Sequence, residues 1–395
     1  MPKNESGPLY KFVEQNGLCF NGEFIYPRSA ANPDFSFREP ITPNGRHFRF
    51  IESPINPRGA ELLSTPDFLN RYFAQKGFKV VSPIPLLNEN GTTLFTCAGV
   101  QILDPIIHQE GPIPQEPTFV AQPVLRTQFI DNIEEGSSTS FINVSTCQLN
   151  ISRQEHFQHL QAWIDLFIQL GLREADLYFK TKPYEQRWGD KTVKSEKIFI
   201  VYDGLEIGDA SYVEDLPQNG RPNLSLSDIG FGLERIKWVM QGGSYFDALG
   251  SGRVASSIDG VSAVCSHTLS LLSGEGLKPS NKAQGYRFRL FSKKLVSNTL
   301  GGHLGTQEQV RDYYKYWERW TSLLMTEDQA IQAVAQENAR NFNRILLDRL
   351  CERHPDVGLD INLPTAVILK RLKGTSVKPD YLNQVLYELK YDNEE

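Results

Sequence analysis

Cysteine is scarce in this chain of 395 residues, and the five that occur are scattered. None forms a CxxC pair, and none lies beside a histidine in the spacing of a metal site. We therefore expect neither a disulfide framework nor a cysteine-rich zinc site. The positions are Cys19, Cys97, Cys147, Cys265 and Cys351.

Long apolar runs are also missing. No stretch approaches the roughly 18 uninterrupted apolar residues of a membrane span. The amino terminus is not followed by the apolar region of a signal peptide. We expect no membrane partner and a cytoplasmic location.

Excess positive charge is missing from the chain as a whole, which has 41 Lys+Arg, 47 Asp+Glu and a net charge of −6. The balance differs along the chain: residues 282–320 carry +5 and the remainder −11. A basic helical region of this kind suits an RNA acceptor, whose phosphates it would contact. Two solvated helices are the alternative.

The chain alternates between turn-rich, strand-like and helical patterns. Residues 1–60 are rich in proline without a helical period and predict an irregular arm. Strands are expected at 118–129 and 140–146, joined by a long mobile loop over 131–139, and again at 197–203 and 205–213. Helices are expected after Thr65-Pro66 and after the capping box formed by Ser152 and Glu155.

Beyond residue 252 every strong signal is helical. The fold class is therefore α+β: an irregular arm (1–60), a mixed domain (61–250) and a helical domain (251–395). His156 and His159 lie three apart in the capped helix and could suit a metal, but with no third ligand nearby we expect a solvated polar face. The expected late helices are 256–273, 281–299, 307–325, 327–351, 362–372 and 379–390.

Three segments carry a family resemblance. Residues 68–81 with 94–100, 121–133 through Phe141, and 227–241 resemble, in this order, the three signature motifs of class II aminoacyl-tRNA synthetases. The detailed match is to alanyl-tRNA synthetases of the archaeal type. The resemblance implies an antiparallel sheet flanked by helices, a homodimer, and ATP with Mg²⁺. Residues 280–289 resemble the start of the family's tRNA-acceptor domain, which implies acceptor contacts at Arg287, Arg289, Lys293 and Lys294.

Arginines suit the chemistry that this resemblance implies. Activation of an amino acid by ATP needs no general base, because the substrate carboxylate is the nucleophile; it needs donors around the α-phosphate. Arg126 and Arg235 match the motif arginines, and a guanidinium can bind phosphate or carboxylate through two donors. A surface or salt-bridged arginine is the alternative for each.

The remaining ATP contacts follow from the resemblance alone. It places Phe141 under the adenine and Arg235 above it, and it implies contacts from Gly232, Asp131 and Asn132. A core phenylalanine and a tight glycine turn, made by Gly230 and Gly232, are the alternatives.

The amino-acid and metal sites are implied in the same way. Asp228 matches the carboxylate that holds the substrate amino group, with Arg126, Trp188 and Ser211 lining the pocket for alanine or another small amino acid. The alternatives are a turn or capping aspartate at Asp228 and a plain core tryptophan at Trp188. Glu206 and Asp209 match acidic Mg²⁺ ligands; at i and i+3 of a regular strand they would face opposite sides, which favours Glu206.

Several positions depart from the family. Ser137 and Ser138 replace an Arg-His pair that reaches the outer phosphates, and Asn143 replaces a carboxylate. Lysines at 191, 194 and 197 could supply substitute phosphate donors. The arm has a single cysteine, Cys19, so no zinc is expected, and we expect no editing domain.

Three functions fit these observations. The first is ATP-dependent formation of an aminoacyl-adenylate with transfer to tRNA. The second keeps the adenylate but transfers to a carrier protein, a peptide or a small natural product. The third is an inactive paralogue that binds an amino acid or tRNA in a regulatory role.

Overall fold

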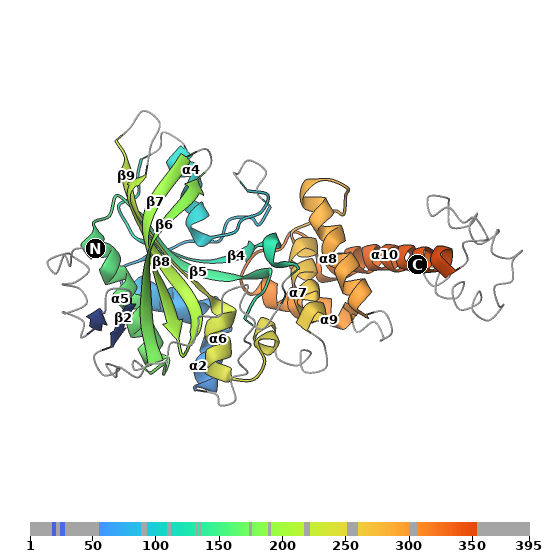
Figure 1. The fold of residues 1–395 in the computed structure, drawn as a ribbon, viewed down its shortest axis with the longest axis horizontal. Coiled ribbons are helices and arrows are strands. Elements are labelled where there is room, and N and C mark those ends of the chain that lie inside the picture. The colour runs from blue at the N-terminus through green and yellow to red at the C-terminus, as the bar shows by residue number, and fades with distance from the viewer. Residues whose placement is uncertain are drawn as a thin grey trace, which may run out of the picture. The chain divides into compact units, whose positions relative to one another are not determined.

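The structure is a computed structural model in which the chain forms two compact units (Figure 1). The first unit comprises residues 1–260 and 315–323, and the second comprises 261–314 and 324–395. No helix of the described part is long and apolar enough to cross a membrane. The described residues are 18–20, 24–27, 55–87, 93–108, 112–131, 133, 136–173, 176–188, 191–216, 222–250, 260–299 and 306–353.

A nine-stranded sheet forms the centre of the first unit, in the order β1-β2-β6-β7-β8-β9-β5-β4-β3. All neighbours in this sheet are antiparallel except β3 and β4, which are parallel. The mixed helix and strand content confirms the α+β prediction. The strands are β1 (Leu18–Phe20), β2 (Phe24–Pro27), β3 (Lys79–Val80), β4 (Thr118–Leu125), β5 (Ser140–Leu149), β6 (Leu177–Trp188), β7 (Lys191–Tyr202), β8 (Leu205–Leu216) and β9 (Leu224–Gly232).

Helices connect and cover these strands. The long helix α5 begins at the predicted capping box: Ser152 accepts from the Glu155 amide, and the Glu155 carboxylate accepts from the Ser152 amide at 2.8 Å. The described helices of this unit are α2 (Pro57–Leu62), α3 (Pro66–Gln75), α4 (Asp104–His108), α5 (Arg153–Gln169) and α6 (Leu233–Gln241), with short 3₁₀ turns η2 (Gly99–Leu103), η3 (Thr127–Phe129) and η5 (Tyr245–Leu249).

An aromatic cluster joins α3 and α5 to the sheet. Phe73 of α3 stacks on Phe119 of β4 with ring centroids 4.3 Å apart, and Trp163 of α5 lies 4.6 Å from Phe231 of β9. The buried Trp163 indole donates to Thr146 Oγ1 of β5 at 2.9 Å. These contacts hold β4, β5 and β9, which carry the candidate site, against one layer of helices.

The prediction of a solvated polar face on α5 is wrong at His156. Its side chain is 1% exposed, and its Nδ1 lies 2.7 Å from Ser227 Oγ of β9. Burial, followed by the neighbouring His159 and Arg153, lowers the His156 pKa to about 3. This histidine is a neutral core residue that packs α5 on the sheet.

The loop before β5 also differs from the prediction of a mobile segment over residues 131–139. Its described end, residues 136–139, is buried, and the Arg126 amide donates to Thr139 O at 2.7 Å. Gly136 takes a positive φ of 76° against the Trp238 ring. The end of this loop is therefore fixed beside α6.

In the second unit, helix α7 is almost wholly buried and α8 packs against α10. Within this unit, Ser266 Oγ and Ser270 Oγ of the buried helix α7 donate to Gln309 Oε1 and Val310 O of α9 at 3.0 and 3.1 Å. The described helices are α7 (Gly260–Gly274), α8 (Ala283–Thr299), α9 (Thr306–Glu318), whose last residues belong to the first unit, and α10 (Glu327–Arg353). The helices expected at 362–372 and 379–390 lie outside the described residues.

Candidate active site

The register of the sheet gathers the predicted amino-acid residues on one face. Lys197 of β7 pairs with Ser211 of β8, and Ser211 pairs with Asp228 of β9. Directly paired residues point to the same face, as do residues two apart on one strand. Asp209 and Gly230 pair with each other and lie two residues from Ser211 and Asp228 on their strands. They therefore share this face with Asp228.

A bulge places both predicted acidic ligands on this same face. Glu206 pairs with Val201 of β7, and Asp209 pairs with Phe199, two residues earlier on the same strand. The spacing is two on β7 but three on β8, because Ile207 is an extra, unpaired residue in β8. Glu206 and Asp209 therefore point to the same face. The expectation that Glu206 and Asp209 face opposite sides is therefore wrong. Burial raises the pKa of Glu206, while Arg235, among other cations, lowers it.

Arg235 at the start of α6 is fixed by two main-chain carbonyls. Its Nε donates to Gly136 O at 2.7 Å, and its Nη1 donates to Glu206 O at 2.8 Å. A Cβ on Gly232, the glycine that precedes α6, would make ordinary van der Waals contacts, 3.8 Å from Arg235 Cγ and 3.9 Å from Phe141 Cδ2. The position at Gly232 is thus bordered by the aliphatic part of the Arg235 side chain and by the Phe141 ring, and we call it the Gly232 cradle.

Arg126 follows β4, and its guanidinium lies over the ring of Phe141, the residue predicted to lie under the adenine. Its guanidinium carbon is 5.0 Å from the centre of the Phe141 ring, and its Nε donates to Cys97 O at 3.0 Å. Its charge lowers the pKa of both Asp228 and Glu206. The two motif arginines and Phe141 are thus brought to the same end of the sheet.

Asp228 is a partly buried carboxylate near charges of both signs. Burial, followed by the neighbouring Asp209, raises its pKa to about 7 against the opposing charges of Lys197 and Arg126. A substrate ammonium would favour the ionised form of this group. Ser211, its cross-strand neighbour, is buried.

Lys197 is a charged group of this face that sequence reasoning treated only as one of three lysines. Its Nζ lies 2.9 Å from Asp209 Oδ1, and its side chain is 15% exposed. Among the described residues no group of three or more His, Cys, Asp or Glu could hold a metal. The two predicted Mg²⁺ ligands share a face, but Asp209 already holds an ammonium group, so only Glu206 fits a metal bound together with phosphates.

Asn143, where the family has a carboxylate, connects three segments of the site. Its Oδ1 accepts from the Gly99 amide at 2.7 Å and from Ser145 Oγ at 3.0 Å, and its Nδ2 donates to Phe231 O at 3.3 Å. A carboxylate could not make the last bond. Sequence reasoning missed this role, because the contact with Gly99 depends on tertiary structure.

Several predicted residues are placed away from these contacts or not placed. Ser137 and Ser138 are buried, and Ser138 Oγ donates to Ser140 O at 2.8 Å. Asp131 is exposed. Asn132 and the side chain of Trp188 lie outside the described residues, so their predicted contacts stay predictions.

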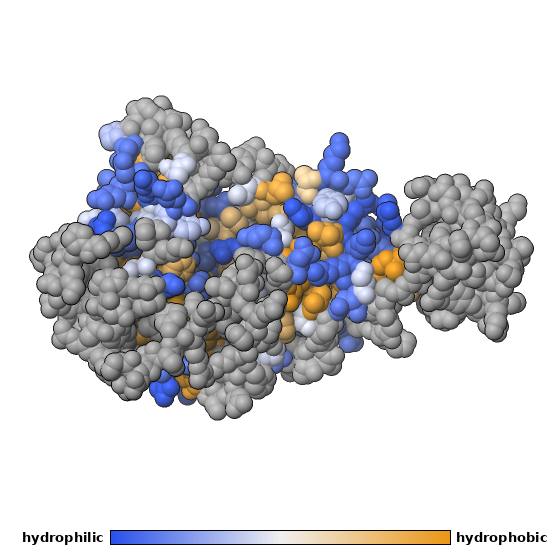
Figure 2. Space-filling model, in the orientation of Figure 1, coloured by the Kyte–Doolittle hydropathy of each residue, from blue (hydrophilic) through white to orange (hydrophobic). Residues whose placement is uncertain are grey.

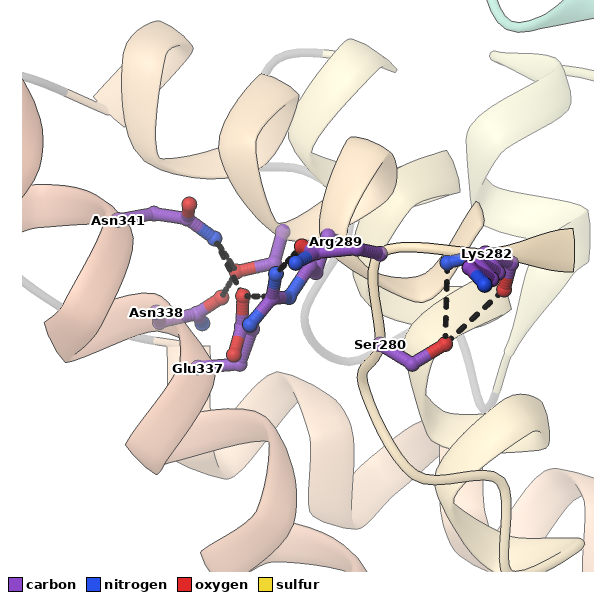
Figure 3. A network of polar contacts seen from close by, with 8 residues as sticks. Ser280, Lys282, Arg289, Glu337, Asn338 and Asn341 are labelled. Carbon is purple, nitrogen blue, oxygen red and sulfur yellow. Dashed lines mark hydrogen bonds and ion pairs between the residues drawn. The ribbon is translucent and has the colours of Figure 1, made fainter. Parts of the chain in front are cut away.

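The predicted acceptor residues lie on α8 of the second unit, whose described surface mixes hydrophilic and hydrophobic residues (Figure 2). Arg289 turns toward α10: its Nε lies 3.3 Å from Glu337 Oε1 (Figure 3), and it also contacts Asn281. Beside it, Ser292 Oγ donates to Asn338 Oδ1 at 2.7 Å. Lys293 is exposed, whereas Arg287 and Lys294 are half-buried.

Comparison with known proteins supports the resemblance to alanyl-tRNA synthetases. The chain is 23% identical over 353 residues to the alanine–tRNA ligase of Sulfurisphaera tokodaii, which covers 70% of this chain. It is 21% identical over 440 residues to that of Halorubrum lacusprofundi, which covers 86% of this chain. The predicted resemblance to an aminoacyl-tRNA synthetase core of class II is thereby confirmed.

The similarity is partial in extent. The chain spans 38% of the length of the first of these relatives and 46% of the second. No family model matches the chain. Among solved structures, a pyrrolysyl tRNA synthetase from Desulfitobacterium hafniense is similar with a TM-score of 0.29 and 14% identity, over 45% of this chain and 68% of that one.

Proposed function

We propose that this protein activates a small amino acid with ATP to form an aminoacyl-adenylate and transfers the aminoacyl group to tRNA. The observation that carries the proposal is that Arg235 and Phe141 both border Gly232, on the face of the sheet that also holds Asp228. Similarity to the archaeal alanine–tRNA ligases supports the same reaction class.

The first step requires positioning and charge stabilisation more than proton transfer. The carboxylate oxygen of the amino acid attacks the α-phosphorus of ATP, the bond from this phosphorus to the bridging oxygen breaks, and pyrophosphate leaves with the electron pair. Arg126 would bind the carboxylate and the α-phosphate, and Arg235 would cover the base opposite Phe141. Asp228 in its ionised form would hold the substrate ammonium group.

The second step transfers the aminoacyl group to an acceptor hydroxyl. The hydroxyl oxygen attacks the carbonyl carbon, the bond to the phosphate oxygen breaks, and AMP leaves while the hydroxyl loses its proton. Exposed Lys293 and its neighbours on α8 would contact acceptor phosphates.

ATP–pyrophosphate exchange across a panel of all amino acids tests the first step. We expect exchange with a small amino acid, and a loss of about 100-fold in Arg235→Ala, because the side chain that would hold the base is removed and ATP is no longer positioned for attack. Arg173→Ala is the matched control, since Arg173 is exposed and forms an ion pair with Asp176, three residues along the chain. The absence of exchange with every amino acid, or an exchange rate in Arg235→Ala equal to that of wild type, would contradict the proposal.

The acceptor is tested separately. Transfer of labelled amino acid to bulk tRNA that disappears after ribonuclease treatment would support tRNA. Exchange without such transfer would favour a carrier protein, a peptide or a small molecule as acceptor. The inactive alternative draws on the buried Ser137 and Ser138, which replace the phosphate-contacting pair, and any robust exchange would exclude it.

A further inference from the structure

Lys197 is held more firmly than an ordinary surface lysine. Its ammonium nitrogen lies 2.9 Å from Asp209 Oδ1, 4.8 Å from the centre of the Tyr184 ring and 5.6 Å from that of Phe199. Aromatic faces attract a cation, and the 15% exposure of the Lys197 side chain limits screening of its charge by water. The carboxylate and the two rings together define one position for the ammonium group.

The electrostatics of the site agree with a fixed cation at this position. Burial alone would lower the pKa of Lys197, but Asp209 reverses the effect and the pKa is raised. Lys197 in turn lowers the pKa of Asp228 and Glu206, the two other carboxylates of this face. It therefore favours the ionised form of both carboxylates and opposes the rise in pKa that burial causes.

A metal ion bound to Asp209 would lie close to this ammonium group. Mg²⁺ binds a carboxylate oxygen at about 2.1 Å, which would bring it close to an ammonium at 2.9 Å from the same carboxylate. Their repulsion would act in a partly desolvated site. Asp209 therefore does not fit the role of a metal ligand that the family resemblance implies.

We propose that Lys197 is a resident cation of this site, whose ammonium group occupies at Asp209 the place that a divalent cation would take. The role of this site in nucleotide binding rests on the proposed function, whereas the position of Lys197 rests on its contacts with Asp209, Tyr184 and Phe199. In the reaction, Lys197 would offer its remaining donors to a phosphate, and a divalent cation would enter with ATP on the Glu206 side alone. Lys197 is thus a specificity-determining residue for the ion requirement of the site.

Binding of Mn²⁺ alone, followed by the electron paramagnetic resonance signal of the free ion, tests this without any activity. We expect Mn²⁺ to bind wild-type protein weakly and Lys197→Met about tenfold more tightly or better, since a positive charge beside Asp209 is removed. Asp209→Asn in the Lys197→Met background should abolish the gain. Lys194→Met is the matched control, because Lys194 lies on the same strand but is 84% exposed and lies 3.7 Å from Glu185.

Two outcomes would overturn the proposal. One is a folded Lys197→Met protein, shown by circular dichroism, that binds Mn²⁺ no better than wild type. The other is a wild-type protein whose Mn²⁺ binding is weakened by Asp209→Asn alone, since Asp209 would then be a ligand despite Lys197. The second measurement holds even if Lys197→Met does not fold, and both can be interpreted if the protein shows no pyrophosphate exchange.

Discussion

Gly232 lies beside two side chains of different character, the cationic Arg235 and the aromatic Phe141. Its φ of −80° suits any L-residue, so the glycine is not required by backbone conformation. An added Cβ would meet only ordinary contacts with Arg235 and Phe141. What an alanine would take away is space, and this separates a ligand-binding role from a structural one.

The first prediction is therefore that Gly232→Ala weakens ATP binding while leaving the fold intact. The methyl group should cost about 1–3 kcal/mol of ATP binding through overpacking, with a free energy of unfolding within about 0.5 kcal/mol of wild type. Calorimetric titration with ATP and urea unfolding measure the two quantities. Gly230→Ala gives the contrast: its Cβ would lie 3.0 Å from Asn143 Nδ2, so this variant should lose stability. ATP affinity unchanged in Gly232→Ala would mean that the base does not lie there.

The second prediction concerns acid stability and His156. The folded-state pKa of about 3 lies below the ordinary 6.5, so below pH 6.5 the unfolded chain takes up a proton that the folded chain does not. Stability is present above pH 6.5 and is lost as the pH falls toward 3, by about 2 kcal/mol at pH 5. His156→Gln, which removes the titration, should flatten the fall in urea midpoint between pH 6.5 and 5. An unchanged slope would contradict this account.

At the residue scale, sequence reasoning predicted chemistry better than surroundings. It identified Arg126, Phe141, Gly232 and Arg235, which the structure brings together, because extended motifs fix residue type and order. It could not predict the bulge at Ile207, since a bulge depends on how two strands pair. The burial of His156 was missed for the same reason: its partner, Ser227, lies 71 residues away.

At the scale of elements, Glu234 connects α6, β5 and the end of α9 within the first unit. Its carboxylate accepts from the Ile142 amide at 3.0 and 3.2 Å and from Tyr316 Oη at 2.6 Å, and it is 1% exposed. Burial raises the pKa of Glu234 to about 7, while its donors, Tyr316 first, lower it. Since Ile142 follows Phe141 and Glu234 precedes Arg235, this network positions both sides of the Gly232 cradle.

The third prediction is that Tyr316→Phe destabilises the first unit by about 1–3 kcal/mol, because a buried carboxyl loses one of its donors. Urea unfolding followed by circular dichroism measures the change. Tyr184→Phe is the control: Tyr184 is 39% exposed, so removal of its hydroxyl should change stability by less than about 0.5 kcal/mol. Equal effects of the two variants would show that the buried hydrogen bond contributes nothing.

Local signals predicted the elements themselves but not their arrangement. Ser152 with Glu155, and Thr65 with Pro66, marked the starts of α5 and α3 because capping acts within one turn. The order of the sheet strands joins segments far apart in sequence, such as β5 with β9, and no local pattern encodes it. The return of residues 315–323 to the first unit was likewise not predictable, since it rests on contacts such as Tyr316 with Glu234.

At the scale of the whole molecule, charge is distributed unevenly along the chain. The +5 of residues 282–320 contrasts with −11 elsewhere, yet the structure shows that these basic residues are not equivalent. Arg289 and Arg311 are paired with Glu337 and Glu327 at 3.3 and 2.7 Å, so part of the positive charge serves the second unit itself. Sequence counting alone could not make this distinction.

The fourth prediction follows from this difference between Lys293, which is exposed, and Arg289, whose side chain is 20% exposed beside Glu337. If α8 contacts RNA phosphates, each contact adds about 0.9 to the negative slope of log K against log salt for a duplex. Lys293→Ala should therefore weaken binding of bulk tRNA and make the slope shallower by about that amount. Arg289→Ala should leave the slope unchanged while lowering the urea midpoint, because the buried Glu337 loses the guanidinium group with which it forms an ion pair. Filter binding from 50 to 300 mM salt separates the two; a shallower slope for Arg289→Ala but not for Lys293→Ala would place the RNA against α10 and the paired side of α8.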